Sequence, residues 1–166
     1  MNDYLFYALN ILLFALPLAL FEINLEKDQG WGGGFPRDKW YGKSSLKDTR
    51  LTRTLSRLTN FSAPLNYHLV IMALFAVVFI SELVFGPGNI WLILSCFFGV
   101  NFFADVFWFS FNWHFNSLTQ LLKGPAGSIK WHKSWVKIGR GFYVPQSYPL
   151  WLGLSIVFFI MAQIWR

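Results

Sequence analysis

The chain has 166 residues, of which 55% are apolar and 20% aromatic, while only 13% are charged. An ordinary soluble domain carries about twice that charged fraction, so the composition excludes this class and predicts an integral membrane protein with one domain, residues 1–166. The net charge is +6. No basic tail or RNA-binding motif accompanies that charge, so we expect no nucleic-acid partner.

Four apolar runs are long enough to cross a bilayer as helices, for which about 20 residues are needed. The predicted spans cover residues 4–21, 65–85, 89–113 and 148–165. The start of the chain, "MNDY", has no basic residue and no small-residue cleavage site follows it, so we expect no cleaved signal peptide. Only "GPGN" separates the second span from the third, which predicts a helical hairpin. The expected fold class is all-α, a four-helix membrane bundle.

Two long connections, residues 22–64 and 114–147, lie on one side of the membrane if there are four spans. Of the 14 Lys and Arg, eight fall in the first connection, five in the second and one at Arg166. Positive charge accumulates on the cytoplasmic side of membrane proteins. The sequence therefore predicts cytoplasmic connections and external termini, in the cytoplasmic membrane of a prokaryote.

The first connection is rich in glycine and aromatic residues near its start. The segment "KDQGWGGGFPRDKWYGK" predicts an ordered interfacial or re-entrant loop rather than a free linker. The segment "KGPAGSIKWHKSW" in the second connection has a similar composition, with Trp131 and Trp135 around His132. Two such loops can close over a site at the level of the lipid headgroups, or they can be ordinary aromatic belts.

Further along the first connection, residues 46–58 predict an amphipathic helix. Arginines at 50, 53 and 57 form one stripe, and leucines at 51, 55 and 58 form another about 100° away. This arrangement fits a helix in the headgroup layer, with Arg50, Arg53 and Arg57 binding the phosphates of anionic lipids. A cytoplasmic helix packed against its own protein is the alternative.

The third span contains an acid among six phenylalanines, in "NFFADVFWFSFNWHF". Asn101, Asp105, Trp108 and Asn112 follow one another at helical spacing, so we expect this stripe to face the bundle interior. An acid in hydrocarbon costs several kcal/mol unless it is neutralised, hydrated or paired. Asp105 is therefore expected to join other polar side chains, although a structural pairing with an asparagine or lysine would also serve.

Candidate partners for Asp105 stand near the same predicted membrane boundary. The candidate catalytic and metal-ligating residues are Glu22, Glu26, His68, Asp105 and His132. We expect Asp105 to lie with at least two of the others. Such carboxylates and imidazoles bind Fe, Zn or Mn, or transfer protons without a metal. Each also has a structural interpretation, as an interfacial histidine or a solvated helix end.

Two further ionisable residues fit this group less well. His114 is a weaker metal candidate, because it stands nine residues beyond Asp105 and so on the opposite side of an ideal helix. Glu82 falls near the external end of the second span and is expected to have a separate role.

Several short motifs are distributed over most of the chain. They are Glu22…Glu26-Lys27…Gly30-Trp31, Tyr67-His68, Asp105-x-x-Trp108-Phe109 with Asn112, and Trp131-His132-x-x-Trp135 followed by Pro145…Tyr148. Their order resembles that in a group of small four-span prokaryotic membrane proteins without an assigned function. This chain departs from the group in having Asp105 instead of Glu and in lacking Thr-Gly before Tyr67. The resemblance implies the four-span fold and no particular activity.

Three functions remain open from the sequence. The first is a membrane-embedded enzyme, with or without a divalent metal, acting on a lipid or isoprenoid-like substrate at the cytoplasmic interface. The second is a non-catalytic accessory subunit of a larger membrane complex, with pigment, quinone or lipid contacts. The third is a small proton-linked transporter or channel using Glu82 and Asp105. Expected partners are the bilayer, anionic lipids, and other membrane subunits or a second copy.

Overall fold

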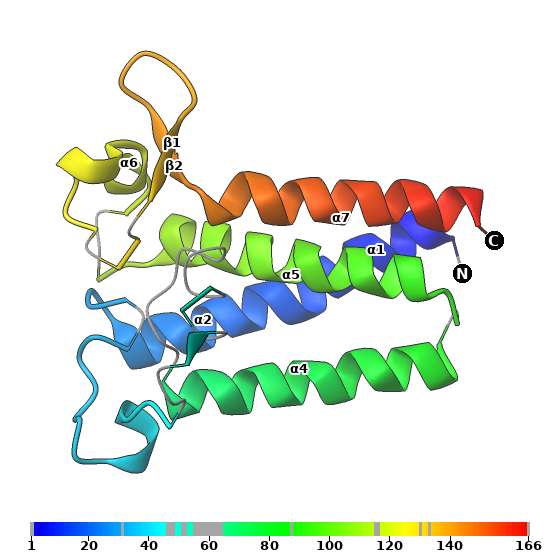
Figure 1. Cartoon of the computed structure of the whole chain (residues 1–166), viewed down its shortest axis with the longest axis horizontal. Coiled ribbons are helices and arrows are strands. Elements are labelled where there is room, and N and C mark those ends of the chain that lie inside the picture. The colour runs from blue at the N-terminus through cyan, green and yellow to red at the C-terminus, as the bar shows by residue number, and fades with distance from the viewer. Residues whose placement is uncertain are drawn as a thin grey trace.

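The computed structural model describes residues 2–30, 32–45, 49–50, 53–54, 65–86, 88–114, 117–129, 131–132 and 134–165. Four helical segments within it are long and apolar enough to cross a membrane: Asp3–Glu26, Asn66–Phe85, Ile90–Phe111 and Ser147–Ile164. They lie side by side, with both termini and the turn before Ile90 at one end and the long connections at the other (Figure 1). The prediction of four long apolar helices is confirmed.

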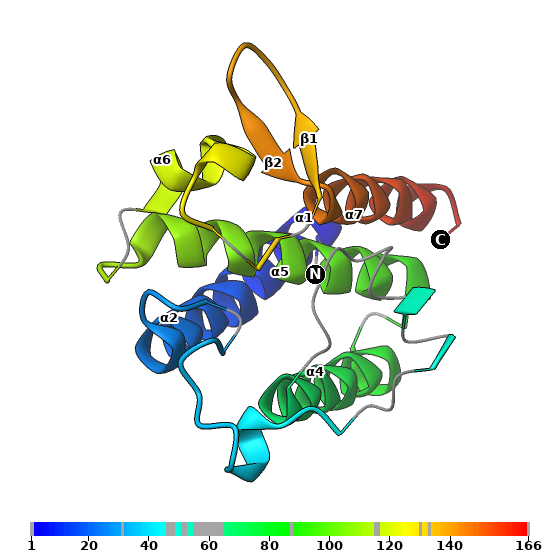
Figure 2. The same ribbon diagram turned by 60° about the vertical axis from the view of Figure 1, so that its left-hand side comes forward.

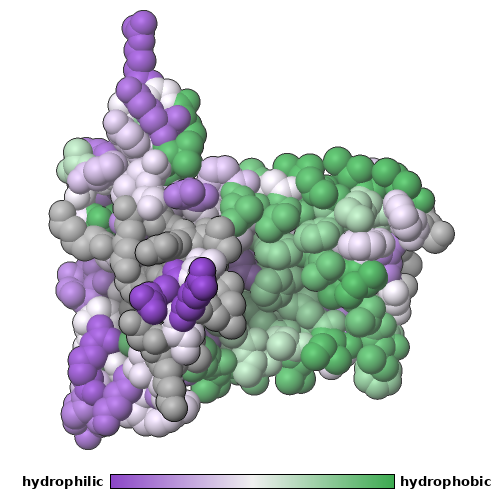
Figure 3. Space-filling view, viewed as in Figure 1, coloured by the Kyte–Doolittle hydropathy of each residue, from purple (hydrophilic) through white to green (hydrophobic). Residues whose placement is uncertain are grey.

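The surface divides along the same axis. An apolar flank covers the long helices, and the hydrophilic surface gathers at the end that carries the connections (Figure 3). This division follows from the sequence, because 13 of the 14 Lys and Arg belong to the two connections.

The first segment consists of α1 (Asp3–Asn10), a π-helical stretch η1 (Ile11–Ala15) and α2 (Leu16–Glu26). Pro17 stands at the start of α2. Within a continuous helix, proline has no N–H to donate to the preceding turn and its ring clashes with that turn's carbonyl. The wider π-helical turn before Pro17 accommodates the ring. The predicted span ends at Phe21, and the helix continues beyond it through Glu22 and Glu26. Glutamate is a good helix former, and the chain leaves the helix only at Lys27, where φ is 54°.

Helix α5 (Ile90–Phe111) is central and contacts the other long helices (Figures 1 and 2). Its main partner is α7 (Ser147–Ile164), and the two are joined where the hydroxyls of Ser95 and Ser155 each donate to the other's carbonyl at 2.8 Å. Gly99 lets the Tyr7 side chain approach α5 closely, and the Tyr7 hydroxyl lies 2.8 Å from Ser155 Oγ.

Helix α4 (Asn66–Phe85) packs least tightly against the bundle and is held partly by the first connection. The buried Asn66 side chain donates to the carbonyl of Trp40 at 2.8 Å and accepts from the Ser45 N–H at 2.9 Å. Trp40 opens a short 3₁₀ turn, η2 (Trp40–Gly42). One buried amide therefore fixes the loop after α2 against the start of α4.

The second connection contains α6 (Ser117–Leu122), the 3₁₀ turn η3 (Gly124–Ala126), and a two-stranded antiparallel hairpin. Its strands are β1 (Trp135–Lys137) and β2 (Tyr143–Pro145), paired as Val136 with Val144. The expected all-α class is therefore wrong for this short segment. Three-residue strands leave almost no alternation in the sequence by which to detect them.

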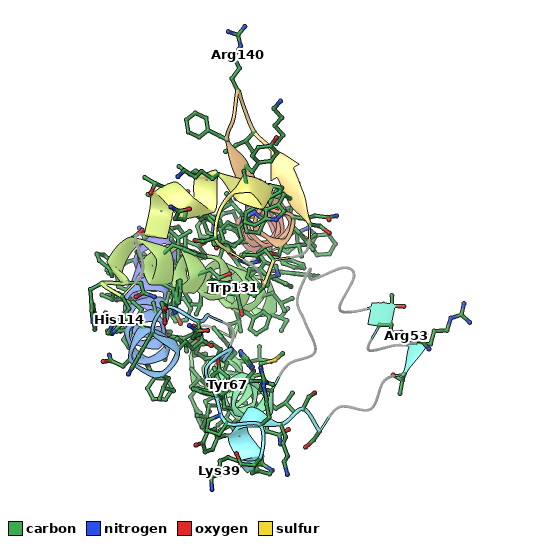
Figure 4. The ribbon with its side chains drawn as sticks, turned by 90° about the vertical axis from the view of Figure 1, so that its left-hand side faces the viewer. Lys39, Arg53, Tyr67, His114, Trp131 and Arg140 are labelled. Atoms are coloured by element: carbon green, nitrogen blue, oxygen red, sulfur yellow. The ribbon has the colours of Figure 1, made fainter. Side chains whose placement is uncertain are left out.

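Much of the predicted amphipathic helix, including Leu51, Leu55, Arg57 and Leu58, lies outside the described residues. Within the described part, Arg50 and Arg53 are exposed, and Arg53 extends away from the bundle (Figure 4). The placement of this helix in the headgroup layer stays a prediction.

Candidate functional site

A small cavity of about 40 Å³ lies at the end of the bundle that carries the connections. It is lined by Glu22, Glu26, Gly30, Asp105, Trp108, Phe109, Trp131 and His132. About two or three water molecules fit into such a space. The cavity therefore admits water, a cation or the reactive end of a larger molecule, but not an acyl chain.

Two helices supply the acidic wall. Glu22 and Glu26 stand one turn apart on α2, so their side chains point to the same side. Asp105 comes from α5, on the polar stripe that also carries Trp108. As we expected from the sequence, Asp105 faces the bundle interior together with Glu22, Glu26 and His132.

The two glycine- and aromatic-rich loops close the cavity from outside. Gly30, with φ of 48°, belongs to the first loop, and a Cβ atom added there would lie 2.5 Å from the Trp131 ring of the second. Trp131 stacks on Phe109 at an interplanar angle of 9° and meets Trp108 edge-on at 5.8 Å. The absence of a side chain at Gly30 thus allows the indole to cover the site.

Glu26 is held by donors from two other elements. Its Oε1 accepts from the Gly32 backbone N–H at 2.7 Å and from the Tyr67 hydroxyl. The His68 Nε2 lies 3.9 Å from the same oxygen. His68 Nδ1 accepts from the Leu65 N–H at 3.0 Å, so a neutral His68 carries its proton on Nε2, facing Glu26. Donors converging on one oxygen favour the ionised carboxylate.

Asp105 has a different environment. The hydroxyl of the buried Tyr148, at the start of α7, faces its carboxyl group. Neither Asp105 Oδ2 nor the Tyr148 hydroxyl has a partner in hydrogen-bond geometry among the described residues. Tyr148 is therefore the group that interacts with the Asp105 carboxyl, and Asp105 Oδ2 makes no other hydrogen bond among the described residues.

His132 provides no positive charge at neutral pH. Burial lowers the pKa of its imidazole to about 4, because the charged form loses its hydration. Of the described residues that line the cavity, none is Lys or Arg. Three carboxyl groups cannot all stay ionised in so small a space without a compensating cation, so the site must hold a proton or bind a cation.

The other predicted site residues lie outside the cavity lining. His68 lies beside Glu26, with its Nε2 3.9 Å from Glu26 Oε1. Glu82 is on another part of α4, where its carboxyl group interacts with Asn10 of α1. His114 is exposed at the edge of this end of the molecule (Figure 4). Asn101 donates to the Phe97 carbonyl of its own helix. Asn112 donates to the Lys27 carbonyl at 2.7 Å and so fixes the end of α2 beside α5.

A metal centre receives no geometric support within the described residues, where no three His, Cys, Asp or Glu side chains converge closely enough to hold an ion. Carboxylate and imidazole groups are suitable ligands for divalent cations in their chemistry. Metal binding therefore stays a prediction from the donor types alone.

Sequence reasoning did not assign Tyr67, Phe109 or Tyr148 to this site. Tyr67 and Phe109 stood next to residues already selected, His68 and Trp108, and a polar neighbour of a candidate histidine was the available signal for Tyr67. Nothing in the sequence places Tyr148 opposite Asp105, since the two are on different helices. The chain matches no protein-family model, no curated protein and no solved structure in the comparisons made.

Proposed function

We propose that this chain is an integral membrane protein with four spans, cytoplasmic connections and external termini. The support is the length and hydropathy of the four helices and the concentration of Lys and Arg at one end. Under this proposal the cavity lies near the cytoplasmic boundary of the bilayer, because α2 ends at Glu26 and α7 starts just before Tyr148.

We propose further that the protein is a membrane-embedded enzyme with general acid–base chemistry in this cavity. The observation that carries the proposal is the convergence of Glu22, Glu26, Asp105 and the neutral His132 in a closed space of about 40 Å³. Buried acids that only stabilise a fold are normally paired with a base or fully hydrogen-bonded. Here Asp105 Oδ2 has no hydrogen-bond partner among the described residues.

The environments of the carboxyl groups assign their roles. Glu26 accepts from Gly32 and Tyr67, so it serves as the ionised general base. Asp105, whose carboxyl group faces the Tyr148 hydroxyl, serves as the protonated general acid. Glu22 lines the same cavity, interacts with both of these carboxyl groups and shares the proton. Two carboxyl groups in different environments are a common basis for acid–base catalysis.

The size and position of the cavity limit the substrate. Only a small reactive group fits between the carboxyl groups, so the bulk of a larger substrate must remain outside. An amphiphile fits this requirement, with its reactive end at the cavity and its apolar tail in the bilayer beside the helices. The proposed substrate class is a lipid or isoprenoid-like molecule.

The test compares lipid extracts of cells that express the protein with those of cells that express single variants. Glu26→Gln and Asp105→Asn keep the shape of the side chain and remove its acid–base function. We expect a lipid species that changes with the wild-type protein and not with either variant. Glu82→Gln is the matched control, since Glu82 lies on α4 outside the cavity, and it should behave as the wild type.

Identical extracts from all four cell lines would contradict the enzyme proposal. Co-purification with a large assembly would then favour the accessory subunit, and proton flux into liposomes lost in Asp105→Asn would favour the transporter. Elemental analysis of the purified protein distinguishes metal-free acid–base catalysis from metal-dependent catalysis. A stoichiometric metal lost in Glu26→Ala would replace the metal-free acid–base proposal by metal-dependent chemistry.

A further inference from the structure

The hairpin of the second connection has an apolar face along its outer part. Val136 pairs with Val144, and the Ile138 N–H donates to the Phe142 carbonyl at 3.0 Å, which continues the same register. Because side chains alternate across a strand, these two pairs stand on the same face. These four side chains are apolar, and the next pair toward the base of the hairpin, Ser134 and Gln146, is polar.

The outer part of this face is not covered by the protein. Ile138 is 60% exposed and Phe142 53% exposed, and Val136 is 36% exposed. At its base, the opposite face packs against the rest of the protein, where Tyr143 covers Gly124 and Pro145 is buried. Val144, on the apolar face, also packs against the protein core. The hairpin is therefore anchored at its base, and the outer part of its apolar face, with Ile138 and Phe142, points outward.

The position of the hairpin relates this face to the bilayer. β2 ends at Pro145, directly before α7 begins at Ser147, so the hairpin stands at the end of the fourth candidate span. It projects sideways from the bundle rather than along the helices (Figures 1 and 2). Apolar surface runs along its edge toward the apolar flank of the helices, whereas its tip is hydrophilic (Figure 3).

The charges of the hairpin complement an anionic surface. Lys137 is exposed on the face opposite Ile138, and Arg140 extends from the tip away from the bundle (Figure 4). Val136, Ile138 and Phe142 can enter the boundary between headgroups and acyl chains while the two cations reach phosphates. Each basic residue near an anionic bilayer adds about 1 kcal/mol of attraction, or about a fivefold change in binding.

We propose that the hairpin of residues 135–145 is an interfacial anchor that inserts its Val136, Ile138 and Phe142 face into the headgroup layer of anionic phospholipids. The proposal rests on the membrane insertion proposed above and is independent of the catalytic role of the cavity. Its consequence for the site is direct, since β1 begins three residues after the cavity residue His132. The anchor would fix that loop, with its Trp131 cover, at the membrane surface.

The experiment places one fluorescent label at a time on the full-length chain in lipid nanodiscs. The single cysteine, Cys96, is buried and is replaced by Ala. Ile138→Cys carries an NBD label on the apolar face, and Lys137→Cys carries it on the opposite face as the matched control. The nanodiscs contain phosphatidylcholine with or without phosphatidylglycerol.

We expect the label at position 138 to be quenched by a lipid-attached nitroxide and protected from aqueous iodide, and the label at 137 to show the reverse. Protection at 138 should be greater with phosphatidylglycerol, and Arg140→Gln should reduce that increase, because Lys137 alone remains to bind the phosphates. Equal iodide quenching at both positions would overturn the proposal. Protection at 138 without lipid quenching would also overturn it, because a protein partner or second copy would then cover the face.

A further label distinguishes a hairpin that does not insert from a protein that does not span the membrane at all. Val77 lies on α4 and is 62% exposed, within a candidate span. A label at Val77→Cys should be quenched by the lipid nitroxide whether or not the hairpin inserts. Quenching at 77 without quenching at 138 would overturn the anchor alone.

Discussion

At the scale of single residues, the hydrogen bond from Tyr67 to Glu26 joins the start of α4 to the cavity. Tyr67→Phe removes this donor from a buried carboxylate, and we expect a loss of about 1.5–3 kcal/mol in the free energy of unfolding. Tyr41→Phe is the control, because Tyr41 also packs edge-on against Phe35 but is 42% exposed. Thermal unfolding in detergent should show a clear decrease for Tyr67→Phe and almost none for Tyr41→Phe. Equal effects would show that the hydroxyl of Tyr67 is not specially placed.

The buried His132 predicts how stability depends on pH. Its pKa is about 4 in the folded protein and 6.5 for an ordinary histidine, so above pH 6.5 both states are neutral and the histidine has no effect. As the pH falls from 6.5 to 4 the unfolded state gains the proton first, and the folded state loses up to about 3 kcal/mol of relative stability. His132→Gln should lack this component. The difference between wild-type and variant unfolding temperatures should therefore change over this pH range and be constant above it.

The closure of the cavity can be tested through Gly30, where two elements meet. Gly30→Ala places a Cβ against the Trp131 ring and also forces a non-glycine residue to a φ of 48°. Gly141→Ala is the matched control, because Gly141 has a φ of 81° but no heavy atom within 4 Å of an added Cβ. Backbone strain costs both variants about 1–2 kcal/mol, and Gly30→Ala should lose a further 1–3 kcal/mol, roughly, from displacement of the indole. Similar unfolding temperatures for the two variants would show that Trp131 moves aside freely.

At the scale of elements, hydropathy was sufficient to predict the four long helices and the short turn between α4 and α5. It did not show that α2 continues as a helix beyond the apolar run, through Glu22 and Glu26 to the cavity. It also missed the hairpin, whose strands have three residues each. Burial against other elements, rather than local pattern, determines both features.

Part of the candidate site could be predicted, because an acidic residue within a predicted membrane span is rare and requires polar partners. Asp105 was selected because an acid among phenylalanines needs partners, and the structure places Glu22, Glu26 and His132 around it. His68 was expected in the same group, but its Nδ1 accepts from Leu65 and its Nε2 faces the far side of Glu26. The sequence shows that such residues stand at similar positions along the predicted spans. Which of them face one another depends on how each helix is rotated and how the loops pack, and no short sequence pattern reports either.

At the scale of the whole molecule, the uneven distribution of charge determines the orientation that we predict. Thirteen of the 14 Lys and Arg stand in the connections at one end, and moving such residues across a membrane is strongly disfavoured. Ser45→Cys, in the Cys96→Ala background, lies exposed in the first connection. It should react with a membrane-impermeant maleimide only after the cells are permeabilised. Gly88→Cys, in the turn at the opposite end where an added Cβ meets no atom within 4 Å, should react in intact cells. Labelling of position 45 from outside would invert the topology and place the carboxylate cavity and the hairpin at the external surface, where they would meet lipids of the outer leaflet instead of the cytoplasmic one.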